Sequence, residues 1–402
     1  MISLEEALHN VDAQLASRRV PTETVDVVNA AGRILASDAT SRLDLPPFDK
    51  SAVDGYAIVD DDSCAEYRLV GSVAAGQTCK HALEPGTTVK VMTGAPVPKE
   101  TGKVIMLERA AERDGFVRFD SIDGPANVVM AAEYVAAGKT ILNSGSKIGS
   151  LEAANLIGCG VCEVRVARRV RVAIVSTGDE LAGSLAELSP GKIINTNGPL
   201  LIGLAERNHL AVTFAATIAD DKAALTAAAK QALAGADIVV LSGGVSAGEY
   251  DFVPDVITGC GLTIHFSNVA AKPGKPTVFA TSDDKIIFGL PGNPVAVYVM
   301  FHLFVLRAAM LISGSSYEPL RFEVALARDF HRRAAGRTEF FPCRVHGGRL
   351  EPAAYHGSGD LAGLIGADGF MVIPQGVNDV PAGDAVSFVI LDPGRVGKYG
   401  SP

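Results

Sequence analysis

The sequence predicts a multidomain α/β protein with a central doubly wound domain and β-rich regions on either side. The chain has 402 residues, which is more than one hydrophobic core usually accommodates. From Val170 onward, continuous apolar runs alternate with Gly-rich turns and helical stretches, a pattern typical of parallel strands joined by helices. Before and after that region the apolar runs are short and separated by turns containing Gly or Pro, as in small β-domains.

The N-terminal part is predicted to begin with an amphipathic helix, because Leu4, Leu8, Val11 and Leu15 recur at helical spacing. A long loop over 43–62 follows. Short β-rich runs are expected at 67–73, 89–92 and 104–108. Together these segments predict a small β-rich domain.

The central part is predicted to hold strands at 171–176, 210–217, 237–241 and 285–290, with helices at 199–207, 222–233 and 253–260. A further stretch over 295–314 is long and apolar enough to span a membrane. It contains His302 and Arg307 and starts with Asn293-Pro294, a helix-start pattern, so we expect a buried helix. Strands at 321–327, 338–345, 370–373 and 385–391 predict a small C-terminal β-domain.

Composition argues against several classes of protein. The formal net charge is −9 and the longest basic cluster is Arg168 to Arg171, so nucleic acid is not an expected partner. The acidic N-terminus does not resemble a signal peptide, and six Cys residues do not form a disulfide framework in a chain of this length. We therefore expect a cytoplasmic protein that does not act in a membrane.

The segments that follow the predicted strands contain the residues most suited to chemistry. In a doubly wound sheet, ligands bind beyond the carboxyl ends of the strands. Gly243 and Gly244 follow one strand and permit positive φ, which would leave N–H groups free to bind a phosphate or another oxyanion. Ser242 and Ser246 would add hydroxyl donors.

Acidic residues gather on the same predicted edge: Asp179, Glu180, Asp220, Asp221, Glu249 and Asp251. Carboxylates beside an anion-binding turn repel the anion unless a cation bridges them, and Mg²⁺ is the usual solution. The alternative is that these acids are solvated or cap helices, as Asp220 and Asp221 would before the helix at Lys222.

Other enzyme motifs are missing. The segment Lys272-Pro-Gly-Lys-Pro276 supplies two cations on a backbone fixed by proline, but the spacing of a Walker A loop is absent. The sequence also lacks H-E-x-x-H, so a zinc hydrolase is not supported.

Taken together, the motifs resemble those of the molybdopterin molybdenumtransferases, the family of MoeA and the gephyrin E-domain. The matching segments run in order along nearly the whole chain: 46–57, 92–98, 177–181, 242–251, 272–276, 289–294, 336–340 and 357–359. The resemblance implies an elongated domain over 1–43 and 127–168, an inserted β-rich domain over 44–126, a molybdopterin-binding domain over 169–314 and a β-barrel over 315–402. It also implies a homodimer.

The resemblance implies that the enzyme uses adenylylated molybdopterin and molybdate with Mg²⁺, and releases AMP as molybdenum joins the dithiolene. Contact with a molybdopterin adenylyltransferase or a recipient molybdoenzyme is compatible with it. The implied metal ligands and catalytic acids are Asp179, Glu180, Asp220 and Asp251, with Asp54 and Thr93 contributed by the partner subunit. The implied substrate-binding residues are Thr177, Gly178, Ser242, Gly243, Gly244, Ser246, Pro291 and Asn293. The implied molybdate-binding residues are Lys272, Lys275, Arg337 and Ser358.

Two family motifs are altered in this chain. Lys50 and Val53 stand where the family usually has Asn and Met, and Val129, Ala132 and Tyr134 replace an Arg, a Gly and an Asp. These changes suggest a second hypothesis, a non-catalytic paralogue that binds and delivers molybdopterin or the finished cofactor. A single-domain molybdopterin adenylyltransferase is a third, which the large flanking domains disfavour. The residues do not distinguish molybdate from tungstate.

Overall fold

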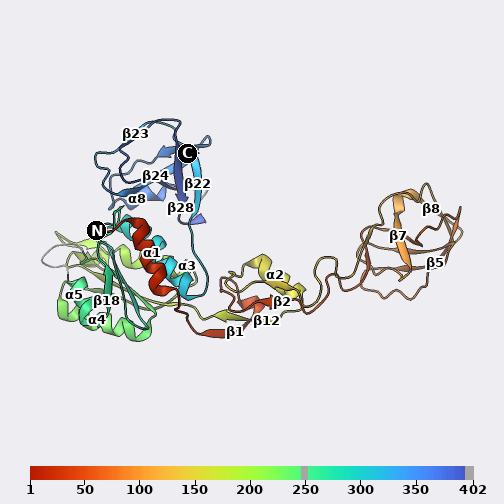
Figure 1. Ribbon diagram of the computed structural model, residues 1–402, viewed down its shortest axis with the longest axis horizontal. Helices are drawn as coiled ribbons and strands as arrows, with labels where there is room; N and C mark the ends of the chain where they lie inside the picture. The colour runs from red at the N-terminus through yellow and green to blue at the C-terminus, as the bar shows by residue number, and fades with distance from the viewer. Residues whose placement is uncertain (246–251, 394–402) are drawn as a thin grey trace. The chain divides into compact units, whose positions relative to one another are not determined.

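The computed structural model describes residues 1–245 and 252–393, and the chain forms two compact units. Unit 1 comprises Met1–Glu23, Gly32–Ala36 and Ala167–Pro402; unit 2 comprises Thr24–Ala31 and Ser37–Val166. Figure 1 colours the chain from its N-terminus to its C-terminus. The predicted boundaries between four domains stay a prediction, since this division groups the chain more coarsely.

The core of unit 1 is a six-stranded sheet in the order β16-β13-β17-β21-β20-β18. Its strands are β13 (Arg171–Thr177), β16 (Ala211–Ile218), β17 (Ile238–Ser242), β18 (Thr263–Phe266), β20 (Val278–Thr281) and β21 (Ile286–Leu290). The first four in spatial order are parallel to one another, whereas β20 pairs antiparallel with both β21 and β18. The predicted doubly wound α/β fold is confirmed, but the sheet is mixed because two short strands that the sequence analysis missed extend one edge.

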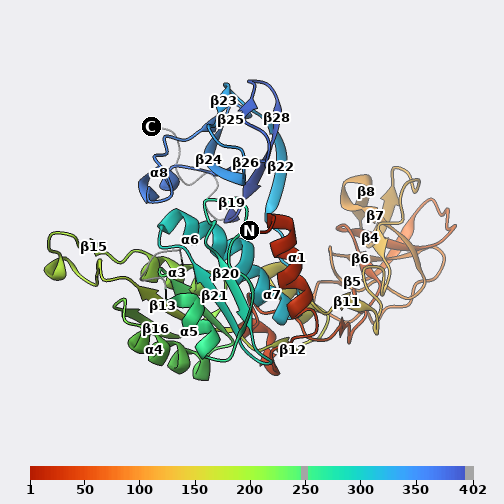
Figure 2. The same ribbon diagram turned by 60° about the vertical axis from the view of Figure 1, so that its left-hand side comes forward.

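Helices cover both faces of this sheet because side chains alternate along each strand. Val172 and Ile174 belong to one core, whereas Ala173 and Val175 belong to the other. Residues of α1 (Leu4–Leu15), α3 (Asn197–Arg207), α6 (Pro294–Met300) and α7 (Arg307–Ile312) pack in the first core, and residues of α4 (Lys222–Gly235) and α5 (Val253–Gly259) pack in the second. Figures 1 and 2 show α4 and α5 on the face away from α1.

The predicted N-terminal helix is present and starts where its sequence dictates. The Ser3 hydroxyl caps α1 by accepting from the Glu6 N–H at 3.0 Å. Leu4, Val11 and Leu15 are buried in the core of unit 1. This helix therefore stabilises the sheet domain.

The long apolar stretch is also a core element. It forms one continuous helical segment in which a π-helical part, η4 (Phe301–Leu306), joins α6 to α7. The segment Pro294–Ile312 is apolar enough to cross a membrane, but 89% of its most apolar window is buried inside the protein. The prediction of a buried helix is therefore confirmed.

The C-terminal part of unit 1 is built on a second sheet in the order β19-β24-β26-β28-β22, with β25 beside β24. These strands are β19 (Ala271–Lys272), β22 (Leu320–Ala325), β24 (Thr338–His346), β25 (Arg349–Pro352), β26 (Gly369–Ile373) and β28 (Ala385–Ile390). A bridge between Leu326 and Leu350 joins the end of β22 to β25, so the sheet closes on itself as a barrel does. Smaller elements are β14 (Leu181–Ala182), η3 (Leu185–Glu187), β15 (Ile193–Ile194), β23 (Phe330–His331), α8 (Leu361–Ile365) and β27 (Asp379–Val380).

Unit 2 contains the predicted β-rich domain, a sheet in the order β7-β4-β6-β5-β9-β8. Its strands are β4 (Gly55–Val59), β5 (Tyr67–Val73), β6 (Thr87–Val91), β7 (Thr101–Met106), β8 (Ala110–Arg113) and β9 (Phe116–Phe119). Two-stranded pairs join the segments before and after this sheet: β1 (Thr22–Asp26) with β12 (Glu163–Ala167), β2 (Ala39–Thr40) with β11 (Thr140–Leu142), and β3 (Lys50–Ser51) with β10 (Val128–Val129). Its helical elements are η1 (Val27–Asn29), η2 (Leu107–Arg109) and α2 (Ser150–Gly158).

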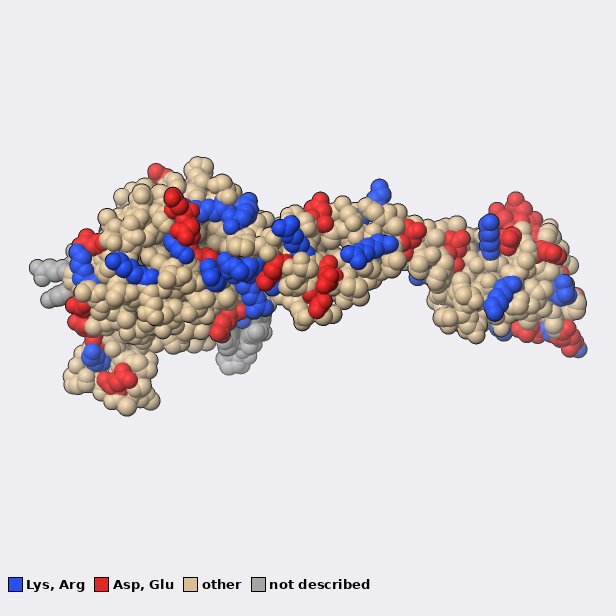
Figure 3. All heavy atoms as spheres, turned by 90° about the horizontal axis from the view of Figure 1, so that it is seen from below, with Lys and Arg blue, Asp and Glu red and all other residues tan. Residues whose placement is uncertain are grey.

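Within each unit, acidic and basic side chains lie side by side on the face drawn in Figure 3. The excess of Asp and Glu over Lys and Arg in the sequence agrees with this distribution.

Candidate active site

The carboxyl ends of four parallel strands meet at one edge of the central sheet and surround a small pocket. The pocket has a volume of about 240 Å³. It is lined by Thr177, Gly178, Glu180, Asp220, Gly243, Gly244, Val245, Pro276, Pro291 and Gly292. The structure therefore brings together predicted residues from the ends of β13, β16, β17 and β21. We call this the glycine pocket.

Asp179 and Asp220 hold each other in place across this edge. The backbone N–H of Asp220 donates to Asp179 Oδ1 at 3.0 Å, and the N–H of Asp179 donates to Asp220 Oδ2 at 3.3 Å. The Thr177 hydroxyl also donates to Asp220 Oδ1 at 2.8 Å. Each carboxylate oxygen has more than one lone pair, so both acids remain able to accept a further ligand.

The neighbouring acid Asp221 has a different role. It is the N-cap of α4, and its side chain accepts from the Ala224 N–H at 2.7 Å. From the sequence, Asp220 and Asp221 could be either helix caps or functional acids. The structure separates them, since only Asp220 lines the glycine pocket.

Gly243 and Gly244 adopt the positive φ values that the motif predicts, 94° and 60°. A Cβ atom at Gly243 would lie 2.3 Å from the Thr177 carbonyl oxygen, so a larger residue does not fit there. The Gly243 N–H donates to the Leu290 carbonyl at 3.1 Å. This group is therefore not free for an anion, contrary to the prediction, and Gly243 instead allows the close approach of two loops.

Ser242 lies beneath the pocket instead of lining it, because its side chain is buried at the end of β17. Its hydroxyl accepts from Asn197 Nδ2 at 2.8 Å, and the same amide donates to the Gly292 carbonyl at 2.7 Å. Asn197 thus joins two loops of the site. The sequence analysis missed Asn197, although Asn-Thr-Asn before the helix at Pro199 could have drawn attention to it.

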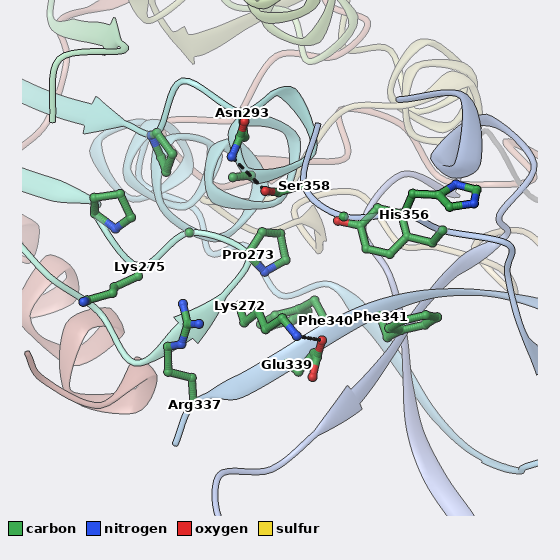
Figure 4. Close-up of a pocket in the computed structure, with 16 residues that line it drawn as sticks. Lys272, Pro273, Lys275, Asn293, Arg337, Glu339, Phe340, Phe341, His356 and Ser358 are labelled. Carbon is green, nitrogen blue, oxygen red and sulfur yellow. Dashed lines mark hydrogen bonds and ion pairs between the residues drawn. The ribbon is translucent and has the colours of Figure 1, made fainter. Parts of the chain in front are cut away.

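A second, larger cavity lies between the central sheet and the C-terminal barrel of unit 1 (Figure 4). Its volume is about 550 Å³. All four residues implied for molybdate line it, namely Lys272, Lys275, Arg337 and Ser358. Pro276 and Pro291 line both cavities, so the two share a rim. We call the larger one the cationic cavity.

The three cations of this cavity are not equivalent. Lys272 Nζ pairs with Glu339 Oε1 at 2.7 Å, as the dashed line in Figure 4 shows. Glu339 is buried and also contacts the guanidinium of Arg332 at 3.4 Å. Among the described residues, no carboxylate pairs with Lys275 or Arg337. These two are therefore the cations open to an oxyanion, and Glu339 is a site residue that the sequence analysis missed.

Asn293 and Ser358 join the barrel to the start of α6. Asn293 Nδ2 donates to Ser358 Oγ at 2.9 Å, and the Val295 N–H donates to the Ser358 carbonyl at 3.0 Å. Tyr355 also lines the cavity, where burial raises the pKa of its hydroxyl to about 12. This hydroxyl therefore remains a hydrogen-bond donor at neutral pH.

Asp54 and Thr93, the residues implied to act from a partner subunit, lie together in unit 2. Asp54 Oδ1 accepts from the Thr93 N–H at 2.6 Å and from the Thr93 hydroxyl at 2.9 Å. These hydrogen bonds lower the pKa of Asp54, the backbone donor contributing most. Asp54 is therefore an exposed carboxylate with a fixed orientation.

Magnesium has a partial ligand set in the described residues. Within ranges 1–245 and 252–393, no group of three or more His, Cys, Asp or Glu side chains forms a metal cluster. Ser246, Glu249 and Asp251 lie outside these residues. Glu180 and Asp220 do line the glycine pocket together. They fit Mg²⁺, which is often held by one or two carboxylates while water and substrate phosphate complete its shell.

Comparison with known proteins agrees with this architecture. The MoeA N-terminal region (domain I and II) matches residues 2–160, a probable molybdopterin binding domain matches 173–310, and the MoeA C-terminal region (domain IV) matches 323–391. A molybdopterin molybdenumtransferase of Staphylococcus epidermidis is 30% identical over 97% of this chain and 96% of its own. One from Nostoc is 34% identical over 91% of this chain and 88% of its own.

Solved structures of molybdopterin biosynthesis MoeA proteins from Pyrococcus horikoshii show the same fold. They cover 98% and 97% of this chain at 30% and 28% identity, with TM-scores of 0.80 and 0.84. Fold and site together define a multidomain protein with a molybdopterin-binding domain. More specifically, the chain belongs to the molybdopterin molybdenumtransferase family and is a transferase of molybdenum cofactor biosynthesis.

Proposed function

We propose that this enzyme transfers molybdenum from molybdate to adenylylated molybdopterin and releases AMP. The observation that supports this most directly is the shared rim of Pro276 and Pro291, which joins a pocket lined by acids to a cavity lined by cations. The pocket lined by acids suits a phosphoanhydride with a bridging cation. The cavity lined by cations suits a tetrahedral dianion. Their contact suits a reaction that joins the two substrates.

The residues of the glycine pocket would hold and orient the phosphoanhydride. Asp220 keeps a fixed orientation because the Thr177 hydroxyl and the Asp179 N–H donate to it. Bound Mg²⁺, on Glu180 and Asp220, would neutralise charge on the phosphate oxygens as the bond to AMP breaks. Gly243 would let the loop that carries Gly244 approach the phosphate closely.

The cationic cavity would receive molybdate. Lys275 and Arg337 would supply charge and N–H donors to the oxyanion, while Ser358 would contribute a hydroxyl. Lys272 would act indirectly, since it already pairs with Glu339. Tungstate has the same shape and charge as molybdate and fits this arrangement equally well.

A homodimer is part of the proposal, with Asp54 and Thr93 supplied to the site by a partner subunit. Several large apolar side chains of unit 2 are exposed in the single chain, as expected of a surface that a second copy covers: Leu43, Phe48 and Met130. Light scattering of the purified protein would then give twice the mass of one chain. A monomer at micromolar concentration would contradict this part of the proposal.

The reaction itself is tested with purified protein, adenylylated molybdopterin, molybdate and Mg²⁺, by following AMP release. We expect release that depends on molybdate and stops when the metal is chelated. A protein that binds the pterin without releasing AMP would instead behave as a carrier. In that case a gain of AMP release by Tyr134→Asp would place the loss of catalysis at Tyr134. A cytoplasmic location and contacts with an adenylyltransferase or a recipient molybdoenzyme stay predictions.

A further inference from the structure

Lys50 and Tyr134 are in contact in unit 2, and both are positions at which this chain departs from its family's motifs. Lys50 Nζ lies 5.3 Å from the centroid of the Tyr134 ring, within the range of a cation–π interaction. The Tyr134 side chain is 61% exposed. Two changes that look independent in the sequence therefore form one structural feature.

The backbone around Tyr134 is held in a fixed conformation. The Ala131 N–H donates to Asp49 Oδ1 at 2.7 Å, and the Met130 N–H donates to Glu133 Oε2 at 2.9 Å. The nearest carboxylates along the chain are thus engaged by backbone donors. The ring is accordingly presented to Lys50 by a segment with little freedom to move.

Lys50 carries a charge that no acid neutralises among the described residues. The Tyr134 ring attracts the ammonium group but leaves it cationic, and its three N–H donors stay available. A carboxylate at the same position would have cancelled the charge and repelled an anion. The contact therefore orients a cation without neutralising it.

The altered positions also compensate for one another in space. Lys50 on β3 is the register partner of Val129 on β10, where the family motif has Arg. Loss of a cation at Val129 and gain of one at Lys50 leave the strand pair with a positive charge, moved to the adjacent strand. This is a physical reason for both changes to occur in one chain.

Lys50 is joined to the surface that carries Asp54 and Thr93. The Ser51 N–H donates to the Ala95 carbonyl at 3.0 Å, and the Gly94 N–H donates to the Ser51 carbonyl at 2.8 Å. These bonds tie the segment from Lys50 to Asp54 against the turn that contains Thr93. The cation and the oriented carboxylate are thus parts of one rigid surface.

We propose that Lys50 binds a phosphate or pyrophosphate oxyanion of the substrate, and that Tyr134 is its positioning residue. The inference rests on the proposed function, because that reaction supplies an anion of this class to the surface that carries Asp54 and Thr93. It makes the departures from the family motifs a move of a cation from one strand to its neighbour, and not a loss of catalysis.

The test compares Lys50→Met with a control at an exposed lysine of the same unit, Lys139→Met. Calorimetry measures the Kd of inorganic pyrophosphate, and AMP release gives KM and kcat for the pterin substrate. We expect Lys50→Met to raise both Kd and KM about tenfold while kcat changes less than about twofold, and Lys50→Arg to restore most of the affinity. Lys139→Met should match the wild type.

The role of Tyr134 is tested with Phe, which keeps the ring, and Leu, which removes it. Tyr134→Phe should bind pyrophosphate like the wild type, whereas Tyr134→Leu should weaken binding about threefold and have no further effect when combined with Lys50→Met. Equal affinities for Lys50→Met and Lys139→Met would overturn the inference even if the wild type turns over. Loss of pyrophosphate binding in Lys50→Met, with no AMP release by the wild type, would reject the proposed reaction but retain the anion site.

Discussion

The two ends of the central sheet carry charged cavities of almost equal size that differ in how their charges are paired. The cavity at the amino ends of the strands has a volume of about 560 Å³, compared with about 550 Å³ for the cationic cavity. At the amino end, Asp237 accepts from the side chains of Arg168 and Arg171 at 3.0 and 3.2 Å. At the other end, Lys275 and Arg337 have no carboxylate partner among the described residues.

The difference teaches that charge alone does not identify a ligand site. The side chains of Arg168 and Arg171 at the amino end already pair with a carboxylate of the protein. Arg18 donates to the carbonyls of Lys285 and Ser282 at 3.1 and 2.6 Å. Their contribution is to fix the ends of the strands. Cations that the fold leaves unpaired are the ones that an anionic substrate can use.

The largest expected effect is that of Asp220→Asn at the functional end. If the proposed function holds, we expect a fall of about 100- to 1000-fold in kcat for AMP release, because an oriented carboxylate of the glycine pocket loses its charge. Asp221→Asn is the matched control, since Asn caps a helix as well as Asp does and turnover should be unchanged. Equal losses of kcat in the two variants would mean that turnover depends on the net charge of this region and not on the geometry of Asp220.

At the opposite end, Asp237→Ala should affect stability and not catalysis. It leaves two guanidinium groups without their acceptor, and we expect the free energy of unfolding in urea to fall by about 2 kcal/mol. The KM values of the folded enzyme should stay at the wild-type level. A change in KM would show that the amino end takes part in substrate binding. It would contradict the conclusion that the charges at this end are structural.

The variant Lys275→Gln tests whether an unpaired cation of the cationic cavity serves binding or stability. Removing an unpaired cation should raise the KM for molybdate about tenfold, or about 1.4 kcal/mol, with little change in thermal stability. Lys230→Gln, at an exposed position of α4, serves as the control. If Lys275→Gln lowered the melting temperature and left KM unchanged, Lys275 would belong with the structural charges of the amino end.

The smallest expected effect lies away from both ends, at Ala132 in unit 2. This residue has a φ of 62°, which disfavours a side chain, so Ala132→Gly should increase the free energy of unfolding by about 0.5 kcal/mol. Ala136→Gly nearby, at a residue without positive φ, should decrease it by a similar amount. Denaturant titration of the two variants checks the opposite signs.

Much of the fold was predictable because its sequence patterns are local. The helix Leu4–Leu15 follows from the helical spacing of its apolar residues, and the strand Arg171–Thr177 follows from its continuous apolar run. The short strand Val278–Thr281 was not predictable, since four buried residues do not reveal whether they run parallel or antiparallel to a neighbour. Its direction is set by tertiary pairing with β21.

The candidate site was predictable in its residue types but not in its pairings. Motif spacing placed Glu180, Asp220 and the two glycines on one edge, and they do line one pocket. No sequence pattern shows that Glu339 forms an ion pair with Lys272, because the two residues lie on separate strands that meet only in the folded chain. Equally, the contact between Lys50 and Tyr134 depends on a strand pair that joins distant segments.

The rim that Pro276 and Pro291 share has a kinetic consequence. Two reactants held in adjoining cavities meet as parts of one complex, so their encounter no longer depends on the concentration of either in solution. Effective molarities of well-oriented groups can reach about 10⁵ M or more, far above the level of any dissolved oxyanion. Scarcity of molybdate would then limit how often the larger cavity is filled, but not how fast a filled enzyme reacts.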